Sequence, residues 1–238
     1  ADYFTKAFME DEKKLNILEA DAYPRATKYI KKMIKAVSEL IKKGYAYEAG
    51  GSVFYDVAKF SDYGKLSGNT LKKLKTAARL ESNPLKKNWF DFALWIKAPE
   101  NHLMKWESPW SRGYPGWHIE CSVMSIDNLG QTIDIHTGGE DNVFPHHENE
   151  IAQSEALTGK KFVNIWLHVR HLLVDGKKMS KSEGNFYTLK DLERKKNSPL
   201  AFRFLVLQSH YRNKMNFTFQ ALQNAENALN GLKEFVNN

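Results

Sequence analysis

Apolar residues recur at intervals of three and four positions between Pro24 and Gly44, the strongest periodic pattern in the chain. The stripe consists of Ile30, Met33, Ile34, Val37, Leu40 and Ile41. Lysines fill the positions between them, while Pro24 suits a first helical turn and Gly44 suits a helix end. The pattern therefore predicts an amphipathic helix from Pro24 to Lys43 with one face against a core.

A second stripe with the same spacing lies near the end of the chain. Its members are Phe219, Leu222, Ala225, Leu229, Leu232 and Phe235. We expect a final amphipathic helix, which needs a partner helix to bury the stripe.

Shorter apolar runs and turn signals alternate in the first half of the chain. Residues 52–57 and 90–96 are rich in β-formers and predict strands, and the lysine-rich residues 71–80 predict a helix. Residues 106–116 contain two prolines and two glycines, so we expect a loop or linker there that marks a domain boundary.

A more regular alternation begins at Trp117. Helical patterns at residues 117–129 and 146–157 alternate with apolar strands at 132–135 and 164–169, and a glycine-bearing loop is expected at 136–144. Such alternation predicts an α/β fold with a parallel sheet covered by helices.

Local signals define the elements after residue 170. Asp175 and Gly176 predict the turn of a hairpin over residues 172–179. Thr188 and Asp191 match a capping box, and Pro199 predicts the start of another helix. Together with the earlier patterns, these signals predict three parts: 1–108, 109–195 and 196–238.

Composition favours a folded protein with an anionic partner. The chain is 42% apolar and 26% charged, which is ordinary for a soluble globular protein, and its formal net charge is +7. That charge favours nucleic acid or a nucleotide as partner, although a lysine-rich surface that serves solubility would give the same value.

Cysteine usage and the absence of long apolar runs predict the compartment. Cys121 is the single cysteine, so no disulfide can form within the chain, as suits a reducing cytoplasm. No stretch has the apolar core of a signal peptide or the ~20 apolar residues of a membrane span. We expect a cytoplasmic chain that does not enter a membrane. Its start, without a methionine, suggests a processed chain or a fragment.

Cys121, His146 and Glu150 have the side-chain chemistry of zinc ligands. His146 and Glu150 are four residues apart, so a helix places them on one face. His147 and Glu148 are competing candidates, but they should point to other faces. The alternative is structural, since a lone cysteine is usually a small core residue and a histidine near a helix start usually lies at the surface.

Two further segments could contact a nucleotide. Gly138 and Gly139 would let a ligand approach the backbone after a strand, and Asp141 could bind ribose hydroxyls, although paired glycines are more often only a turn. Residues 178–185 hold two lysines and two hydroxyls in a loop that could neutralise charge during phosphoryl or adenylyl transfer. The spacing is not that of a P-loop, and composition alone would favour a solvated basic loop.

Several of these segments are similar to signatures of one enzyme family. Residues 178–182 spell KMSKS, the signature loop of class I aminoacyl-tRNA synthetases. The segments GWHIECS at 116–122 and FPHHENE at 144–150 resemble the zinc-site segments of cysteinyl-tRNA synthetases. Residues 16–18, 24–27 and 91–95 also look like that family. The chain therefore resembles cysteinyl-tRNA synthetases from near its start to about residue 215.

The resemblance implies a reaction and a set of roles. Members condense L-cysteine with ATP, which carries Mg²⁺, to cysteinyl-adenylate, and then transfer cysteine to the 3′ end of cysteine tRNA. A zinc ion that binds the substrate thiolate rejects serine. The implied roles are as follows: zinc ligands Cys121, His146 and Glu150; cysteine pocket Trp117 and His136; ATP site Gly138, Gly139, Asp141 and Lys181; catalytic lysines Lys178 and Lys181. The backbone around residues 168–171 would frame the adenine, and His118 and His147 would support the zinc ligands.

The resemblance also implies an architecture. We expect the second half of a Rossmann-like parallel-sheet catalytic domain, with a mixed α+β connective insertion before it and the start of a helical stem after it. The family's HIGH motif, a further cysteine zinc ligand and the anticodon-binding portion have no counterpart in the sequence. A monomeric fragment is therefore expected, which alone would bind zinc weakly and would not activate cysteine.

Two alternatives remain open at this point. A ligase of the same catalytic fold could join cysteine to an amino sugar without any tRNA. A chain of this length could also bind tRNA without catalysis.

Overall fold

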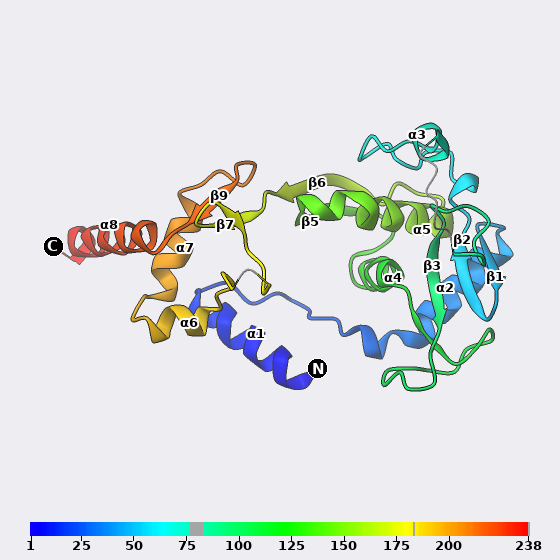
Figure 1. The fold of residues 1–238 in the computed structure, drawn as a ribbon, viewed down its shortest axis with the longest axis horizontal. Coiled ribbons are helices and arrows are strands. Elements are labelled where there is room, and N and C mark those ends of the chain that lie inside the picture. The colour runs from blue at the N-terminus through cyan, green and yellow to red at the C-terminus, as the bar shows by residue number, and fades with distance from the viewer. Residues whose placement is uncertain (77–82, 183, 238) are drawn as a thin grey trace. The chain divides into compact units, whose positions relative to one another are not determined.

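The computed structural model describes residues 1–76, 83–182 and 184–237. These residues form two compact units (Figure 1). The larger unit is Ala22–Leu167, and the smaller one combines Ala1–Asp21 with His168–Asn238. The three-part division expected from the sequence remains a prediction.

A four-stranded antiparallel sheet forms one side of the larger unit. Its strands, in spatial order, are β1 (Ala46–Ala49), β2 (Ser52–Tyr55), β3 (Phe92–Lys97) and β4 (Gly113–Pro115). The expectation of a loop or linker over residues 106–116 was wrong for Gly113–Pro115, because Tyr114 pairs with Ile96 and Pro115 with Trp95. Proline is tolerated here because β4 is an edge strand, but its composition hides the strand from propensity rules.

The core of the larger unit is centred on helix α2 (Ile30–Lys42). Four members of the predicted stripe, Ile30, Met33, Val37 and Leu40, are buried against the sheet and two further helices. The helix does not begin at Pro24: a separate 3₁₀ turn, η1 (Ala26–Lys28), comes first. The apolar periodicity located the buried face correctly, whereas the proline signal placed the start too early.

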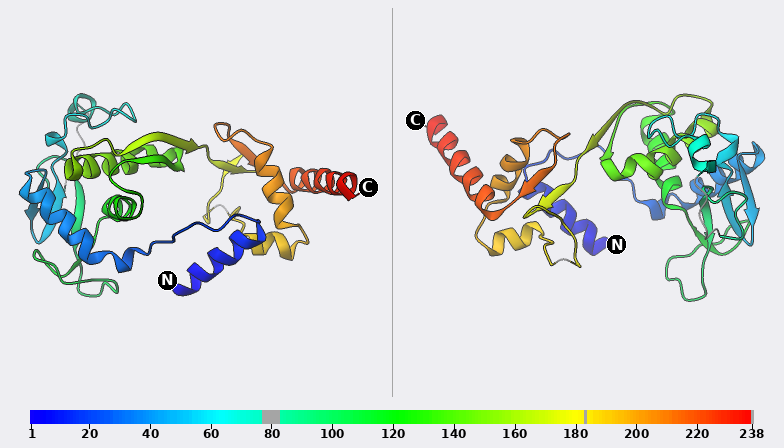
Figure 2. Two further views of the ribbon diagram at one scale, coloured as in Figure 1. Left: turned by 180° about the vertical axis from the view of Figure 1, so that it is seen from behind. Right: turned by 45° about the horizontal axis from the view of Figure 1, so that its top comes forward.

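Two helices and a two-stranded sheet complete the part of this unit that carries the predicted site. The helices are α4 (Trp117–Leu129) and α5 (Glu148–Thr158), and the strands are β5 (Ile133–Gly139) and β6 (Val163–Val169). Figures 1 and 2 show α4 and α5 next to each other, and both also contact α2. β5 is longer than predicted, since it continues through the glycines that were assigned to a loop.

Short segments connect these elements. They are the 3₁₀ turns η2 (Val57–Lys59) and η3 (Glu140–Asn142), helix α3 (Leu71–Thr76), and the π-helical segment η4 (Val143–His147), which leads directly into α5. The helix predicted for residues 71–80 is confirmed as far as Thr76, and its remainder lies outside the described residues.

The smaller unit contains the hairpin and the C-terminal helices. Its elements are α1 (Asp2–Lys14), β7 (Leu172–Val174), β8 (Lys177–Lys178), α6 (Leu189–Arg194), α7 (Pro199–Leu207), β9 (Met215–Phe217) and α8 (Phe219–Asn237). The strand order is β8-β7-β9, with β7 and β9 parallel. The predicted hairpin, the Thr188 capping box and the helix starting at Pro199 are all confirmed.

The C-terminal helix buries only part of its apolar stripe. Leu222 and Ala225 are buried against α7, whereas Leu232 and Phe235 are 52% and 81% exposed. Helix α1, which the sequence patterns did not reveal, is held by Arg203, whose guanidinium donates to the carbonyls of Leu15 and Asn16. The helices within the described residues are too short or too polar to cross a membrane.

Leu40→Ala should lower the free energy of unfolding of the larger unit by about 3 kcal/mol, because it leaves a cavity in a fully buried position. Urea unfolding followed by tryptophan fluorescence would measure the change. The control Lys42→Ala removes an exposed side chain of the same helix and should shift stability by less than about 0.5 kcal/mol. Equal effects of the two changes would contradict the assigned core.

Candidate metal centre and nucleotide loops

A close approach of backbone atoms sets the start of helix α4. Gly116 lies between β4 and α4, and its N–H donates to the carbonyl of Leu94 at 2.9 Å. A Cβ atom at this position would lie 2.0 Å from the carbonyl oxygen of Ala93, so only glycine fits. The start of α4, whose first two turns carry Trp117, His118 and Cys121, is thereby fixed against the sheet.

The segment that carries His146 and Glu150 begins with irregular helical backbone and continues as a regular α-helix. Residues 143–147 are π-helical, with Phe144 in an extended conformation, and regular α-helix starts at Glu148. The predicted helix end is confirmed, since Gly159 adopts a left-handed φ of 71°. His146 and Glu150 therefore share one face, as their spacing predicts, although the helix between them is not uniform.

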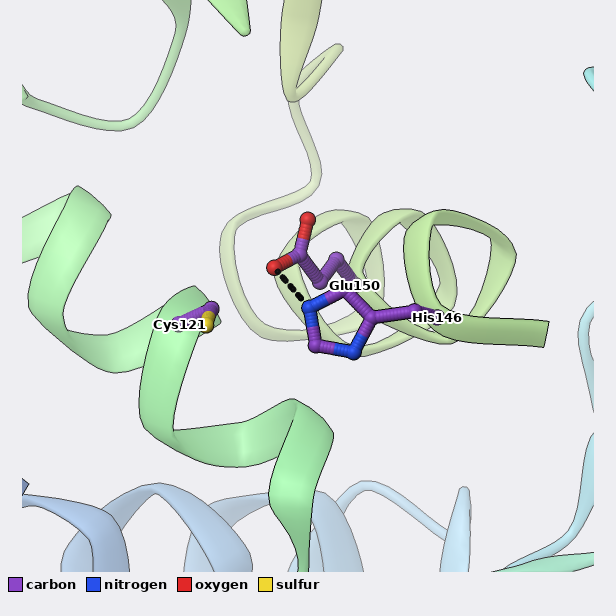
Figure 3. Close-up of side chains that lie close together, drawn as sticks. All are labelled: Cys121, His146 and Glu150. Atoms are coloured by element: carbon purple, nitrogen blue, oxygen red, sulfur yellow. Dashed lines mark ion pairs between the residues drawn. The ribbon is translucent and has the colours of Figure 1, made fainter. Parts of the chain in front are cut away.

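The structure brings Cys121, His146 and Glu150 together. One ligand atom from each lies within 4.8 Å of the others, and Figure 3 shows Cys121 extending from α4 toward the other two. His146 Nε2 is 3.1 Å from Glu150 Oε1. Both His146 and Glu150 are buried, at 6% and 0% exposure. The three groups thus form a small, largely buried polar site.

Glu150 is the most constrained member of this site. Its Oε2 lies 2.6 Å from His136 Nε2, whereas its Oε1 accepts no well-formed hydrogen bond from the described residues. Burial opposes ionisation, but the hydrogen bond from His136 and the proximity of His146 outweigh it and hold the pKa of Glu150 at about 2. A buried, ionised carboxylate with one oxygen left over is the arrangement that a cation would complete.

The thiol of Cys121 is protonated when no cation is present. Burial, followed by the negative charge of Glu150, raises its pKa to about 12. A thiol coordinates a metal as thiolate, so binding would release its proton. The donor set of thiolate, imidazole and carboxylate fits zinc, and three protein ligands leave a tetrahedral position open.

His118 and Trp117 surround His146 on the side of α4. His118 Nδ1 is 2.8 Å from His146 Nδ1, so one of the two nitrogens must donate to the other. Burial, and then the proximity of His146, lower the pKa of His118 to about 4, which keeps it neutral at pH 7. His146 can then donate from Nδ1 and present Nε2 to a metal. The ring of Trp117 lies 4.6 Å from that of His146 and is 62% exposed, so it forms an open aromatic wall.

His147 does not point away from the site as expected. With His136 and Glu150 it forms a second group of ligand atoms within 4.8 Å of one another. Trp166 packs on both imidazoles, with ring centroids 4.7 Å from His136 and 4.6 Å from His147. The π-helical segment explains the difference, because it changes the direction of the side chains that precede α5.

Close contacts with neighbouring side chains explain why glycine occupies positions 138 and 139. A Cβ at Gly138 would lie 2.5 Å from His147 Cε1, and one at Gly139 would lie 2.5 Å from Asp141 Oδ1. Asp141 itself is exposed. The role of these residues in ATP binding remains a prediction.

The KMSKS loop lies in the smaller unit and is organised by Asn185. The Asn185 side chain accepts from Ser180 N at 2.8 Å and donates to Lys178 O at 3.2 Å, which closes the loop. Met179 packs on the core of this unit, while Lys178 and Lys181 are exposed. Lys181 Nζ lies 5.6 Å from the centroid of the Phe186 ring. Both ammonium groups are therefore available to an anionic ligand, although their catalytic role stays a prediction.

The fold is that of class I tRNA synthetases. A solved structure of a putative arginyl t-RNA synthetase from Campylobacter jejuni superimposes with a TM-score of 0.56 at 15% identity, over 93% of this chain and 40% of that one. Residues 1–227 match the family described as tRNA synthetases class I (C) catalytic domain, so the chain belongs to this family and has an α/β fold.

Similar curated proteins carry one name. The proteins named cysteine–tRNA ligase from Trichodesmium erythraeum and Thermococcus onnurineus are each 52% identical to this chain, over 98% and 100% of its length. The same name belongs to a protein of Chlamydia pneumoniae at 51% identity over 98% of the chain. The chain spans about half the length of these relatives, 49%, 50% and 50% respectively.

Gly138→Ala should lower the free energy of unfolding of the larger unit by about 1–3 kcal/mol, because the new methyl group collides with the His147 ring. Urea unfolding in the presence of a chelator would measure it. Gly231→Ala is the control: Gly231 lies in α8 with nothing within 4 Å of an added Cβ, and alanine should stabilise that helix by about 0.5–1 kcal/mol. An unchanged free energy of unfolding after Gly138→Ala would contradict the described packing of His147.

Proposed function

We propose that this chain supplies the zinc site and the KMSKS loop of a cysteine–tRNA ligase. The enzyme would activate L-cysteine with ATP to cysteinyl-adenylate and transfer cysteine to the 3′ end of cysteine tRNA. The observation that carries the proposal is the convergence of one thiol, one imidazole and one carboxylate in a class I (C) catalytic domain. Relatives named cysteine–tRNA ligase at about half identity support the same substrate.

Cys121, His146 and Glu150 would hold the zinc ion. The spare Oε1 of Glu150 and the imidazole of His146 are already in place, and Cys121 has only to lose its proton. A zinc ion there would accept the thiolate of cysteine as a ligand and disfavour serine, because an alcohol is a poorer ligand.

Other side chains of the site would shape the amino-acid pocket. The exposed ring of Trp117 would cover one side of the substrate. His136, whose Nε2 bonds to Glu150, would line another side and keep the carboxylate oriented. The backbone of Gly138 and Gly139 and the exposed Asp141 would face the adenylate.

The lysines of the KMSKS loop would act on the phosphates of ATP, which binds with Mg²⁺. Lys178 and Lys181 are both exposed. Lys181 would neutralise the charge that develops on the α-phosphate and on the leaving pyrophosphate as the carboxylate of cysteine attacks. Lys178 would assist from the other end of the same short loop.

The proposal includes an architecture. The larger unit would combine a connective insertion with the second half of a Rossmann-like sheet, to which β5 and β6 would belong. Helices α7 and α8 would begin a stem that contacts tRNA, consistent with the formal charge of +7. The proposal also includes a monomeric enzyme in the cytoplasm.

A cysteine–amino-sugar ligase would need the same thiol-binding corner but no tRNA. The names of the relatives favour tRNA as acceptor. Extension of the chain to the length of its relatives would allow a direct choice, since such a protein should charge cysteine tRNA and leave amino sugars unmodified.

Cys121→Ser, His146→Ala and Glu150→Ala should each lower the zinc affinity of the chain by at least about 100-fold, because each removes one of three ligands. Competition titration with a chromophoric chelator would measure the affinity. Glu155→Gln is the matched control, because Glu155 lies further along α5 and accepts from Phe162 N, away from the three ligands. Zinc binding that survives all three changes would refute the assignment.

Lys181→Ala, in a protein extended to the length of the relatives, should slow cysteine-dependent ATP–pyrophosphate exchange by about 100–1,000-fold. The KM for cysteine should change less than about 3-fold, because the lysine would act on phosphates rather than on the amino acid. Lys177→Ala removes the exposed neighbouring charge in β8 and should leave exchange nearly unchanged. A parallel loss in kcat and in cysteine affinity after Lys181→Ala would argue for a structural role of the loop.

A further inference from the structure

Helix α5 lacks the usual means of fixing its first turn. No side chain caps its N-terminus, and the five residues before it are π-helical and include the non-helical Phe144. Yet His146, in η4, and Glu150, in this turn, both have to meet Cys121 on another helix. Because the backbone at Phe144 departs from helical geometry, contacts from elsewhere in the chain are needed to fix the direction of this segment.

A buried carboxylate on this turn binds the backbone of a distant loop. Glu148, only 1% exposed, accepts hydrogen bonds from Gly64 N at 3.0 Å and from Ser67 N at 2.7 Å. Neither donor is near Glu148 in sequence, so the contact joins the loop of residues 63–68 directly to α5. Buried hydrogen bonds of this kind are costly to lose, because the donor is then left without a partner.

The loop is shaped to present these two N–H groups. Gly64 has a φ of +88°, and a Cβ there would lie 2.2 Å from the carbonyl oxygen of Asn69. Gly68 N donates back to Gly64 O at 2.8 Å, and Asn69 N donates to Ser67 Oγ at 3.1 Å. The turn is therefore tight, and its amides converge on one anion, which is the carboxylate of Glu148.

A second contact lies beside the first. Tyr63 is 3% exposed, and its hydroxyl donates to Asn149 Oδ1 at 2.5 Å. The Tyr63 ring also packs edge-on against Phe144, with centroids 6.5 Å apart. The loop thus contacts the extended residue before the helix and two consecutive residues of its first turn.

We propose that Glu148, held by the backbone of loop 63–68, is a positioning residue that fixes the first turn of α5 so that His146 and Glu150 meet Cys121. The inference rests on the proposed zinc site and adds residues that do not touch the ion. His146 precedes Glu148 by two residues and Glu150 follows it by two, so a shift at Glu148 moves both ligands together. Loop 63–68 anchors this segment through the side chain of Glu148.

Glu148→Gln tests the proposal with a nearly isosteric change. The amide nitrogen cannot accept a hydrogen bond, so at least one of the two backbone donors loses its partner. Zinc affinity should fall by about 10–100-fold, as for other residues that orient metal ligands. Hydrogen exchange in the metal-free chain should become faster both in residues 63–68 and in residues 143–150.

Glu155→Gln is the matched control, because it makes the same change on the same helix. Glu155 Oε1 accepts from Phe162 N at 3.0 Å, a bond that the amide oxygen of glutamine can keep, so this variant makes the same chemical change away from the ligands without removing a backbone partner. Its zinc affinity should stay within about 3-fold of the unchanged chain, and hydrogen exchange at residues 63–68 and 143–150 should stay unchanged. Thermal unfolding of both variants shows whether each remains folded.

The outcomes separate the two proposals. Equal zinc affinities for Glu148→Gln and Glu155→Gln, or unchanged exchange at residues 143–150, would overturn the positioning role. If the unchanged chain binds no zinc, the zinc proposal fails, and exchange in the metal-free chain still decides whether Glu148 fixes this turn. Should Glu148→Gln not fold, Tyr63→Phe, which removes only the hydroxyl bonded to Asn149, should reproduce the faster exchange at 143–150 in milder form; unchanged exchange there would count against the proposal.

Discussion

An ionised carboxylate with no exposed surface is the constraint on which the site depends. Glu150 is fully buried, and its pKa is nevertheless held at about 2 because His136 is hydrogen-bonded to it and His146 lies beside it. Burial of such a charge without partners would cost several kcal/mol, so the surrounding side chains cannot be exchanged freely. His136 and His146 are arranged around this one group. His118 and Trp166 in turn pack against these two imidazoles.

Helix α5 differs from an ordinary amphipathic helix in what it buries. Its buried residues are Glu148, Asn149, Glu150, Ala152, Gln153, Ser154 and Ala156, most of them polar. Helix α2, in contrast, buries an apolar stripe and exposes lysines. Apolar packing therefore gives the larger unit its stability, whereas α5 is held by specific polar contacts, such as the hydroxyl of Tyr55 bonded to Ala152 O at 2.9 Å. A polar helix inside a domain is typical of a functional element, because polar groups are costly to bury for stability alone.

Much of this arrangement could be predicted from local sequence patterns. The stripe of α2, the Asp175-Gly176 hairpin and the Thr188 capping box depend on residues close in sequence, and the structure confirms them. The spacing of His146 and Glu150 likewise predicted a shared face. Cys121 joins them because α4 contacts α5. The sequence pointed to Cys121 only through the chemistry of its side chain, not through its spacing from the other two.

The features that were missed depend on contacts distant in sequence or on irregular backbone. Strand β4 has a loop-like composition and exists because β3 supplies its hydrogen bonds. His147 reaches His136 and Glu150 because of a π-helical segment that no periodicity reveals. Glu148 meets Gly64 across 84 residues, and only the glycine's need for a positive φ hinted at a special turn.

X-ray absorption at the zinc edge tests the central claim most directly, since it reports the ligand atoms themselves. The chain loaded with one equivalent of zinc should show one sulfur ligand at about 2.3 Å and nitrogen or oxygen ligands at about 2.0–2.1 Å. Addition of L-cysteine should add a second sulfur, whereas L-serine should not. A first shell without sulfur, or one that cysteine leaves unchanged, would contradict the account of Cys121, His146 and Glu150 as a thiol-selecting zinc site.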